Sequence, residues 1–302
     1  SGPRAAGRPK LAVAVTFPID PPRGGGQVRI FELYRELAHV YDVELVTLGR
    51  PGTAASRREI APRVWETRVP KSDEHAKREG RLQAEAGALV GDVATMSLYG
   101  CTPAYLEALR DAARGARAVI ASHPYTLPAI HEVADAPLWY EAHNVEADLK
   151  AHVLVGSACA EALLRETERT ERACCEEAEL IWACSDEDRA DLIRRYAPRP
   201  EKVEVVPNGV ALEDLEYVSI PARRAHKRRL GMAERCLAVF IGSWHAPNVE
   251  ALRTLLELAP SQPAVDFMCL GTVGMALADA ELPDNVDLAG PFAPEFRRAV
   301  LS

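Results

Sequence analysis

Cysteine pairs with the spacing of metal-binding or redox motifs are absent from this chain of 302 residues. The seven cysteines are odd in number, and no two of them form a C-x-x-C motif. Several lie within apolar runs, which is typical of buried thiols in a reducing compartment. The pattern argues against a zinc site, and we expect a cytoplasmic protein that binds no metal.

Long hydrophobic runs and an excess of positive charge are also missing. No uninterrupted apolar segment is long enough for a membrane helix, and residues 1–8 lack the apolar core of a secretion signal. The formal net charge is -8, so the surface as a whole does not attract nucleic acid or anionic lipid. We therefore expect no nucleic-acid partner and no integral membrane segment, although a local basic pocket remains compatible with this charge.

Strand and helix patterns alternate over most of the chain. Apolar runs typical of strands occupy residues 11–15, 42–48, 63–69, 116–122, 137–141, 180–184 and 203–210, the last of which ends in turn residues. Helical spacing separates several of them, as in the amphipathic residues 157–179. The alternation predicts an α/β fold with a doubly wound parallel sheet covered by helices. The charged residues 72–81 predict a solvated helix or loop.

The strand–helix pattern restarts after a strongly basic stretch at residues 219–229. New strands are predicted at residues 237–242, 265–270 and 286–290, with a helix at residues 247–258. The length of the chain suits two domains. We therefore assign residues 9–210 to one Rossmann-like domain and residues 211–302 to a second.

Three consecutive glycines stand between the first predicted strand and a predicted helix at residues 28–38. Glycine lets a backbone approach a ligand closely, and a helix start behind it offers free N–H groups to a phosphate or sugar oxygen. A flexible surface loop is the alternative. A dinucleotide fingerprint fits poorly, because Arg29 stands where its third glycine belongs and the second strand ends without an acidic residue.

Five segments in order resemble the family 4 glycosyltransferases, retaining enzymes of the GT-B fold. They are residues 24–26, residues 122–124, residues 140–146, residues 183–188 with 206–210, and residues 240–243 with 247–248. The resemblance implies two Rossmann-like domains facing a cleft, with the nucleotide-diphosphate sugar mainly on the second domain and the acceptor mainly on the first. It also implies metal-independent hexosyl transfer with retention of configuration and no cofactor.

The resemblance assigns roles to individual residues. The expected catalytic residue is His123. The expected nucleotide-sugar and phosphate-binding residues are Gly24, Gly25, Gly26, Gln27, Gly242, Ser243, His245 and Asn248. The expected acceptor-side residues are Arg23, Tyr125, His143, Asn144 and Glu146. A structural role at the start of a loop is the alternative for His143 and Asn144, and Asn208 is expected to organise the turn between the domains.

The sequence departs from the family at two places. Many relatives have an Arg and a Lys after the first strand of the second domain, whereas residues 242–248 contain neither. The second domain also has fewer strands than a whole one, so we expect it to be incomplete and to lack the paired glutamates that hold the donor.

The acceptor is expected to be a sugar, a lipid or a natural product, and a homodimer is a further expectation. Two alternative functions are a GT-B nucleotide-sugar epimerase and a truncated, non-catalytic binding partner.

Overall fold

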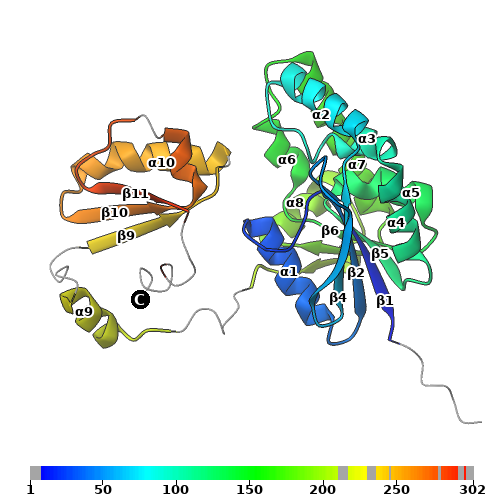
Figure 1. The fold of residues 1–302 in the computed structure, drawn as a ribbon, viewed down its shortest axis with the longest axis horizontal. Helices are drawn as coiled ribbons and strands as arrows, with labels where there is room; N and C mark the ends of the chain where they lie inside the picture. Colours follow the sequence, from blue (N-terminus) through cyan, green and yellow to red (C-terminus); the bar gives the residue numbers. More distant parts are fainter. Residues whose placement is uncertain are drawn as a thin grey trace, which may run out of the picture. The chain divides into compact units, whose positions relative to one another are not determined.

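The structure is a computed structural model that describes residues 8–209, 217–229, 236–244, 246–277, 280–291 and 296. The chain divides into two compact units, of which the first ends at Gly209 and the second begins at Val210. Each unit has its own sheet, ordered β3-β4-β2-β1-β5-β6-β7-β8 in the first and β11-β10-β9 in the second (Figure 1).

The eight-stranded sheet of the first unit is parallel except at one edge, where β3 pairs antiparallel with β4. Its strands are β1 Lys10–Val15, β2 Asp42–Gly49, β3 Ser56–Ala61, β4 Val64–Pro70, β5 Ala118–Ser122, β6 Leu138–Glu141, β7 Leu180–Ala183 and β8 Val203–Val205. Strand β1 lies between β2 and β5, so the strand order reverses there. The carboxyl ends of strands at such a reversal are the usual ligand position in open α/β sheets.

Helices cover both faces of this sheet. They are α1 Gly25–Leu37, α2 Asp73–Ala86, α3 Thr95–Leu98, α4 Pro103–Ala113, α5 Leu127–Val133, α6 Glu146–Ala151, α7 Ala158–Glu177 and α8 Asp186–Tyr196, with 3-10 turns η1 Tyr99–Cys101, η2 Pro124–Thr126 and η3 Pro200–Lys202. Successive side chains of β1 point to opposite faces. Leu11, Val13 and Val15 pack with α1, whereas Ala12 and Ala14 pack with α4, α5, α7 and α8. The continuous apolar run of β1 is therefore explained by burial on both sides.

Serine side chains begin three of the helices. Ser72, Ser157 and Ser185 accept hydrogen bonds from the backbone N–H groups of the first turns of α2, α7 and α8. Such caps satisfy donors that a helix start leaves free. The charged residues 72–81 do form a helix, but His75 within it is fully buried.

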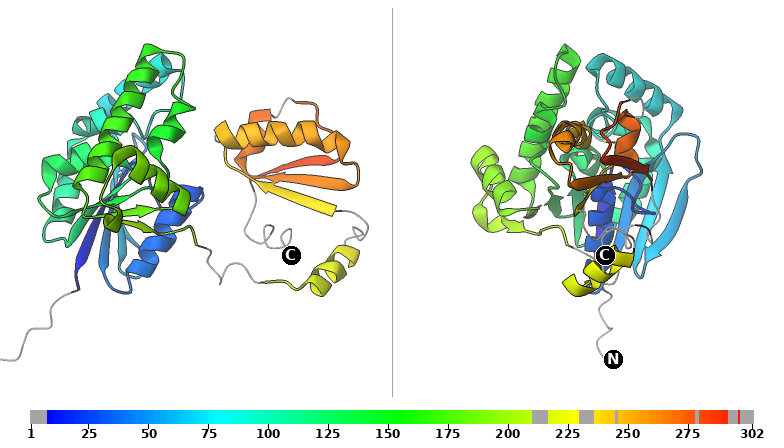
Figure 2. Two further views of the ribbon diagram at one scale, coloured as in Figure 1. Left: turned by 180° about the vertical axis from the view of Figure 1, so that it is seen from behind. Right: turned by 90° about the vertical axis from the view of Figure 1, so that its left-hand side faces the viewer.

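The described part of the second unit has a three-stranded parallel sheet with helix α10 against one face (Figure 2). Its elements are α9 Ile220–Arg229, β9 Cys236–Ile241, α10 Ala246–Leu258, η4 Ala259–Ser261, β10 Val265–Leu270, η5 Thr272–Leu277 and β11 Val286–Gly290. Leu252 of α10 and Phe267 of β10 belong to one buried cluster. The basic stretch identified in the sequence forms α9.

Two local predictions differ from the structure. Helix α1 begins at Gly25 rather than at Val28, so two of the three glycines lie in its first turn. Strand β3 was not predicted because Arg57, Arg58 and Glu59 are charged and exposed. Charged side chains are typical of edge strands, where they discourage pairing with another chain.

Gly271 has a backbone that only glycine can adopt. Its φ is +96°, and a Cβ built there would lie 2.3 Å from the carbonyl oxygen of Gly242. We expect Gly271→Ala to destabilise the second unit by about 2 kcal/mol or more, through backbone strain and this clash. Gly290→Ala is the control, because its φ is +67° but nothing lies within 4 Å of its added Cβ. Equal losses of stability in the two variants, measured by thermal unfolding, would contradict this account.

Candidate functional site

The loop after β1 is held in place by a buried carboxylate. Glu66 of β4 is 2% exposed and accepts hydrogen bonds from the backbone N–H groups of Ile19 (2.9 Å) and Asp20 (3.2 Å). Thr47 and Arg68 donate to the same carboxylate at 2.9 Å each. Glu66 was not identified from the sequence. A signal was present, because Glu66 is two residues after Val64 in a predicted strand and therefore lies on the same face as this apolar side chain. Glu66 therefore fixes the path of the chain toward the glycines.

The segment from Gly24 to Gln27, here called the glycine turn, starts helix α1. The side-chain oxygen of Gln27 accepts from the N–H groups of Arg23 (3.0 Å) and Gly24 (2.9 Å), and its amide donates to Pro18 (2.6 Å). Gln27, expected to bind phosphate, thus shapes the turn, and Arg23 is exposed. Among the described residues, none accepts a hydrogen bond from the N–H of Gly25, Gly26 or Gln27. Free N–H groups at a helix start favour an anion.

His123, the expected catalytic residue, directly follows β5 and has a strained backbone. Its φ of 72° and ψ of 153° lie in a region used almost only by glycine, at a cost of about 1–3 kcal/mol. Such strain clusters at functional sites. The His123 ring stacks on His143 with 3.9 Å between centroids and meets the edge of Phe17 at 5.8 Å. Its Nδ1 is buried without a partner, and burial, with a contribution from His143, lowers its pKa to about 4.

Among the acceptor-side residues, Glu146 binds both Tyr125 and Asn144. The Glu146 carboxylate accepts from the Tyr125 hydroxyl and, at 3.1 Å, from the Asn144 amide. Its Oε1 lies 3.9 Å from Nε2 of His123. Burial and the nearby Glu146 raise the pKa of Tyr125, so its hydroxyl remains a donor. The structure therefore brings these three residues together beside His123.

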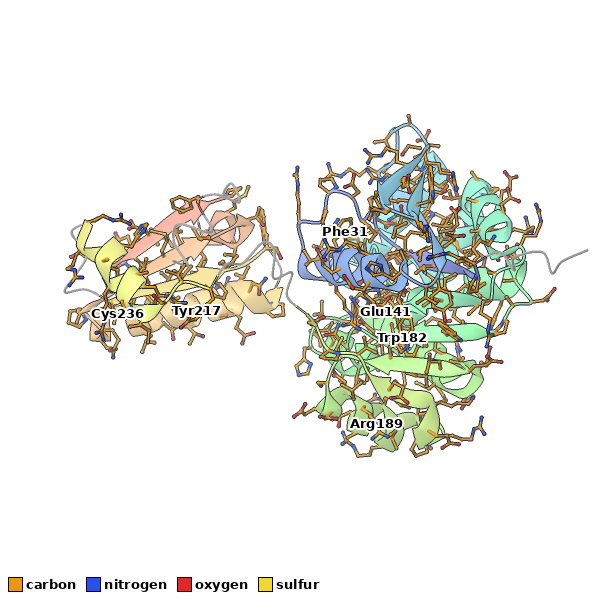
Figure 3. All side chains as sticks on the ribbon, turned by 90° about the horizontal axis from the view of Figure 1, so that it is seen from below. Phe31, Glu141, Trp182, Arg189, Tyr217 and Cys236 are labelled. Atoms are coloured by element: carbon orange, nitrogen blue, oxygen red, sulfur yellow. The ribbon has the colours of Figure 1, made fainter. Side chains whose placement is uncertain are left out.

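Glu141 lies at the buried centre of the site, between α1, which carries Phe31, and β7, which carries Trp182 (Figure 3). Its carboxylate accepts from Tyr34 at 2.9 Å and Arg29 at 3.2 Å, and lies 3.3 Å from Nε2 of His143. Burial alone would raise its pKa, but His143, Arg29 and Tyr34 together lower it to about 2. Glu141 was not among the site residues expected from the sequence.

Arg29 connects this centre to the end of the first unit. One nitrogen of its guanidinium donates at 2.9 Å to both the Val206 carbonyl and the Asn208 side-chain oxygen. Arg29 therefore ties the end of the first unit to Glu141, through its Nε and one of its two terminal nitrogens. The Asn208 side chain is held by this hydrogen bond where the chain leaves the first unit, and its role in organising the turn between the domains stays a prediction.

The described phosphate residues predicted in the second unit, Gly242, Ser243 and Asn248, lie after β9 and at the start of α10. The Asn248 side chain donates to the Ser243 carbonyl at 3.0 Å, and the Gly242 carbonyl accepts from Val273 at 3.1 Å. His245 lies outside the described residues. A ligand role for these residues stays a prediction.

Within the part of the chain that the structure describes, no His, Cys, Asp and Glu side chains group in a way that could hold a metal ion. Over the same residues, every helix is too short or too polar to cross a membrane.

Comparisons with known proteins agree with this architecture. A family model described as a glycosyl transferase 4-like domain matches residues 24–209. No curated protein sequence matches the chain.

Several solved structures share the fold. Sucrose-phosphate synthase from Thermosynechococcus elongatus has a TM-score of 0.68 at 14% identity, covering 96% of this chain and 72% of its own. HepE from Anabaena, solved with UDP and glucose, has a TM-score of 0.59 at 14% identity, and the match covers 95% of this chain and 72% of HepE. The trehalose 6-phosphate synthase from Burkholderia multivorans has a TM-score of 0.53 at 14% identity, and the match covers 97% of this chain and 74% of the synthase. The expected GT-B fold is thereby confirmed.

Backbone strain at His123 predicts an unusual order of stabilities. We expect His123→Gly to be about 1 kcal/mol more stable than His123→Ala, because both lose the ring but only glycine relaxes the positive φ. At the neighbouring strand residue Ser122, the alanine variant should be the more stable of the pair. Denaturant unfolding tests this order, and an alanine variant at position 123 that equals or exceeds the glycine variant would contradict the strain.

Buried histidines predict a loss of stability in acid. Burial, with smaller effects of Lys71 and His143 respectively, lowers the pKa of His75 and His123 to about 4 from 6.5. Between these values the unfolded chain binds protons that the folded chain excludes, so the free energy of unfolding falls as the pH drops, by up to about 1.4 kcal/mol per pH unit for each histidine. His75→Gln should make this fall shallower, whereas His39→Gln on the exposed surface should not. Equal slopes in all three proteins would disprove the assignment.

Proposed function

The chain belongs to the glycosyl transferase 4-like family, and on that premise we propose that it moves a hexose from a nucleotide-diphosphate sugar to an acceptor, with retention of configuration and without a metal ion. The observation that carries the proposal is the meeting of two features at one sheet edge. The glycine turn leaves three N–H groups free after β1, and the strained His123 follows the neighbouring strand β5.

The glycine turn is suited to stabilise a departing phosphate. Unpaired N–H groups and the positive end of the α1 dipole lower the energy of negative charge that develops on the leaving group. In the proposed step the acceptor hydroxyl oxygen bonds to the anomeric carbon as the bond from that carbon to the phosphate oxygen breaks. The hydroxyl proton passes to the departing phosphate, so atoms and charges balance without a protein nucleophile.

His123 would contact the transferred sugar. Its low pKa keeps the ring neutral at pH 7, so that one nitrogen can accept and the other donate a hydrogen bond to sugar hydroxyls. The connected Tyr125, Asn144 and Glu146 would hold the acceptor on the same side. In the second unit, Gly242, Ser243, His245 and Asn248 are proposed to bind the nucleotide phosphates.

UDP-glucose is the first donor to test, because HepE has a solved structure in complex with UDP-glucose. We expect UDP or its sugars to raise the unfolding temperature more than GDP, TDP or ADP. Ligand at a hundred times its dissociation constant should add roughly 2.7 kcal/mol of stability.

Product analysis with and without acceptor then separates transfer from epimerisation, which consumes no acceptor. No shift with any nucleotide would argue strongly against a glycosyltransferase.

An alanine substitution at Gly26 should weaken nucleotide-sugar binding more than the same substitution at another helical glycine. A Cβ there would lie 3.4 Å from the Phe17 ring and 3.8 Å from Nδ1 of His143, at the proposed phosphate position. We expect Gly26→Ala to fold normally and to lose about tenfold or more in nucleotide-sugar affinity, since about 1.4 kcal/mol is a factor of ten. Gly80→Ala is the matched control, because its Cβ would meet nothing within 4 Å in helix α2. Calorimetry that finds wild-type affinity in Gly26→Ala would exclude this position.

A further inference from the structure

Two stacked histidine rings at the sheet edge differ in their partners. Nε2 of His143 lies 3.3 Å from Oε1 of Glu141 and 3.2 Å from Oγ of Ser122. His123 has no comparable contact, because its Nδ1 is buried without a partner and its Nε2 is 3.9 Å from Glu146. A carboxylate thus holds one ring of the pair and not the other.

The two rings therefore differ in what a proton on the second nitrogen would face. Imidazolium at His143 would face the Glu141 carboxylate, whereas imidazolium at His123 would bury an unpaired N–H. With ring centroids 3.9 Å apart, like charges on both rings would repel. The other charged groups around the pair are Arg29, which shares Glu141, and the carboxylates of Glu146 and Asp92, which act on His123. Only His143 of the two has a close carboxylate at hydrogen-bond range.

The second nitrogen of His143 is directed toward the glycine turn. Nδ1 lies 3.8 Å from the position of a Cβ at Gly26, and the side chain is only 6% exposed. Among the described residues, none forms a hydrogen bond with this nitrogen. This ring nitrogen therefore lies beside the glycine turn, whose N–H groups are free.

We propose that His143, held through Nε2 by Glu141, donates an N–H from Nδ1 to an anionic phosphate oxygen of a ligand at the glycine turn. The inference rests on the proposed function and gives His143 a direct ligand contact instead of the acceptor-side or structural role expected from the sequence. Glu141 is then a positioning residue, because it orients the His143 ring and pairs with its charge. His123, stacked on His143, stays neutral and free for sugar hydroxyls.

Nitrogen-15 NMR of histidine-labelled protein tests the proton positions directly. When inorganic pyrophosphate or UDP is bound to the wild-type protein, we expect both ring nitrogens of His143 to carry protons and the Nδ1 signal to move from its position without ligand. His143→Gln identifies the signal by its loss. Glu141→Gln should remove the second proton while leaving the signal of the exposed His131, which pairs with Glu177, unchanged. If Nδ1 of His143 carries no proton and its signal does not move with either ligand, the proposal is overturned. This result needs only the wild-type protein, so it holds even if the Glu141 variant fails to fold.

Affinity measurements separate this inference from the function on which it rests. His143→Gln should weaken UDP and pyrophosphate binding about tenfold, as expected for one lost charge-assisted hydrogen bond. His131→Gln, the matched surface control, should bind like the wild type. If wild-type protein and His143→Gln bind equally, the role of His143 is wrong and the proposed function stands. If the wild type binds neither UDP nor a UDP-sugar, both fail.

Discussion

The buried carboxylate of Glu141 is the contact on which the candidate site depends. An isolated buried charge is costly, and this one is stabilised by partners on separate elements: Arg29 and Tyr34 on α1, and His143 after β6. Because Arg29 also holds Val206 and Asn208, the same carboxylate connects the glycine turn, the histidine pair and the point where the chain leaves the first unit.

Two further buried carboxylates position the segments around this centre. Glu66 fixes the loop after β1, and Glu171 of α7 accepts from the backbone N–H groups that begin α6, at 2.7 and 3.0 Å. Helix α6 carries Glu146, which faces His123. Rigid carboxylate anchors of this kind can support a strained residue, because the surrounding contacts leave His123 no relaxed alternative. The site is therefore built from buried polar contacts that join separate elements and together fix its geometry.

The sequence was most informative where burial has a regular period. The runs at residues 11–15, 180–184 and 265–270 were predicted as strands because their apolar side chains must be covered, and the order of strands and helices was sufficient to predict the fold class. The start of α1 was predicted too late in the chain, because glycine has a low helix propensity. The contact of Arg29 with Glu141 could not be predicted, because it joins residues 112 apart that no local pattern connects. Burial of His75 was missed because its neighbours in sequence are charged.

We conclude that the glycine turn and His143 bind one anionic leaving group. A crystal structure of the protein with UDP-glucose tests it most directly. We predict a phosphate oxygen at about 3 Å, the normal hydrogen-bond distance, from the backbone nitrogen of Gly25 or Gly26. A bound nucleotide sugar whose phosphates lie away from helix α1, with the glycine turn contacting only water, would contradict it.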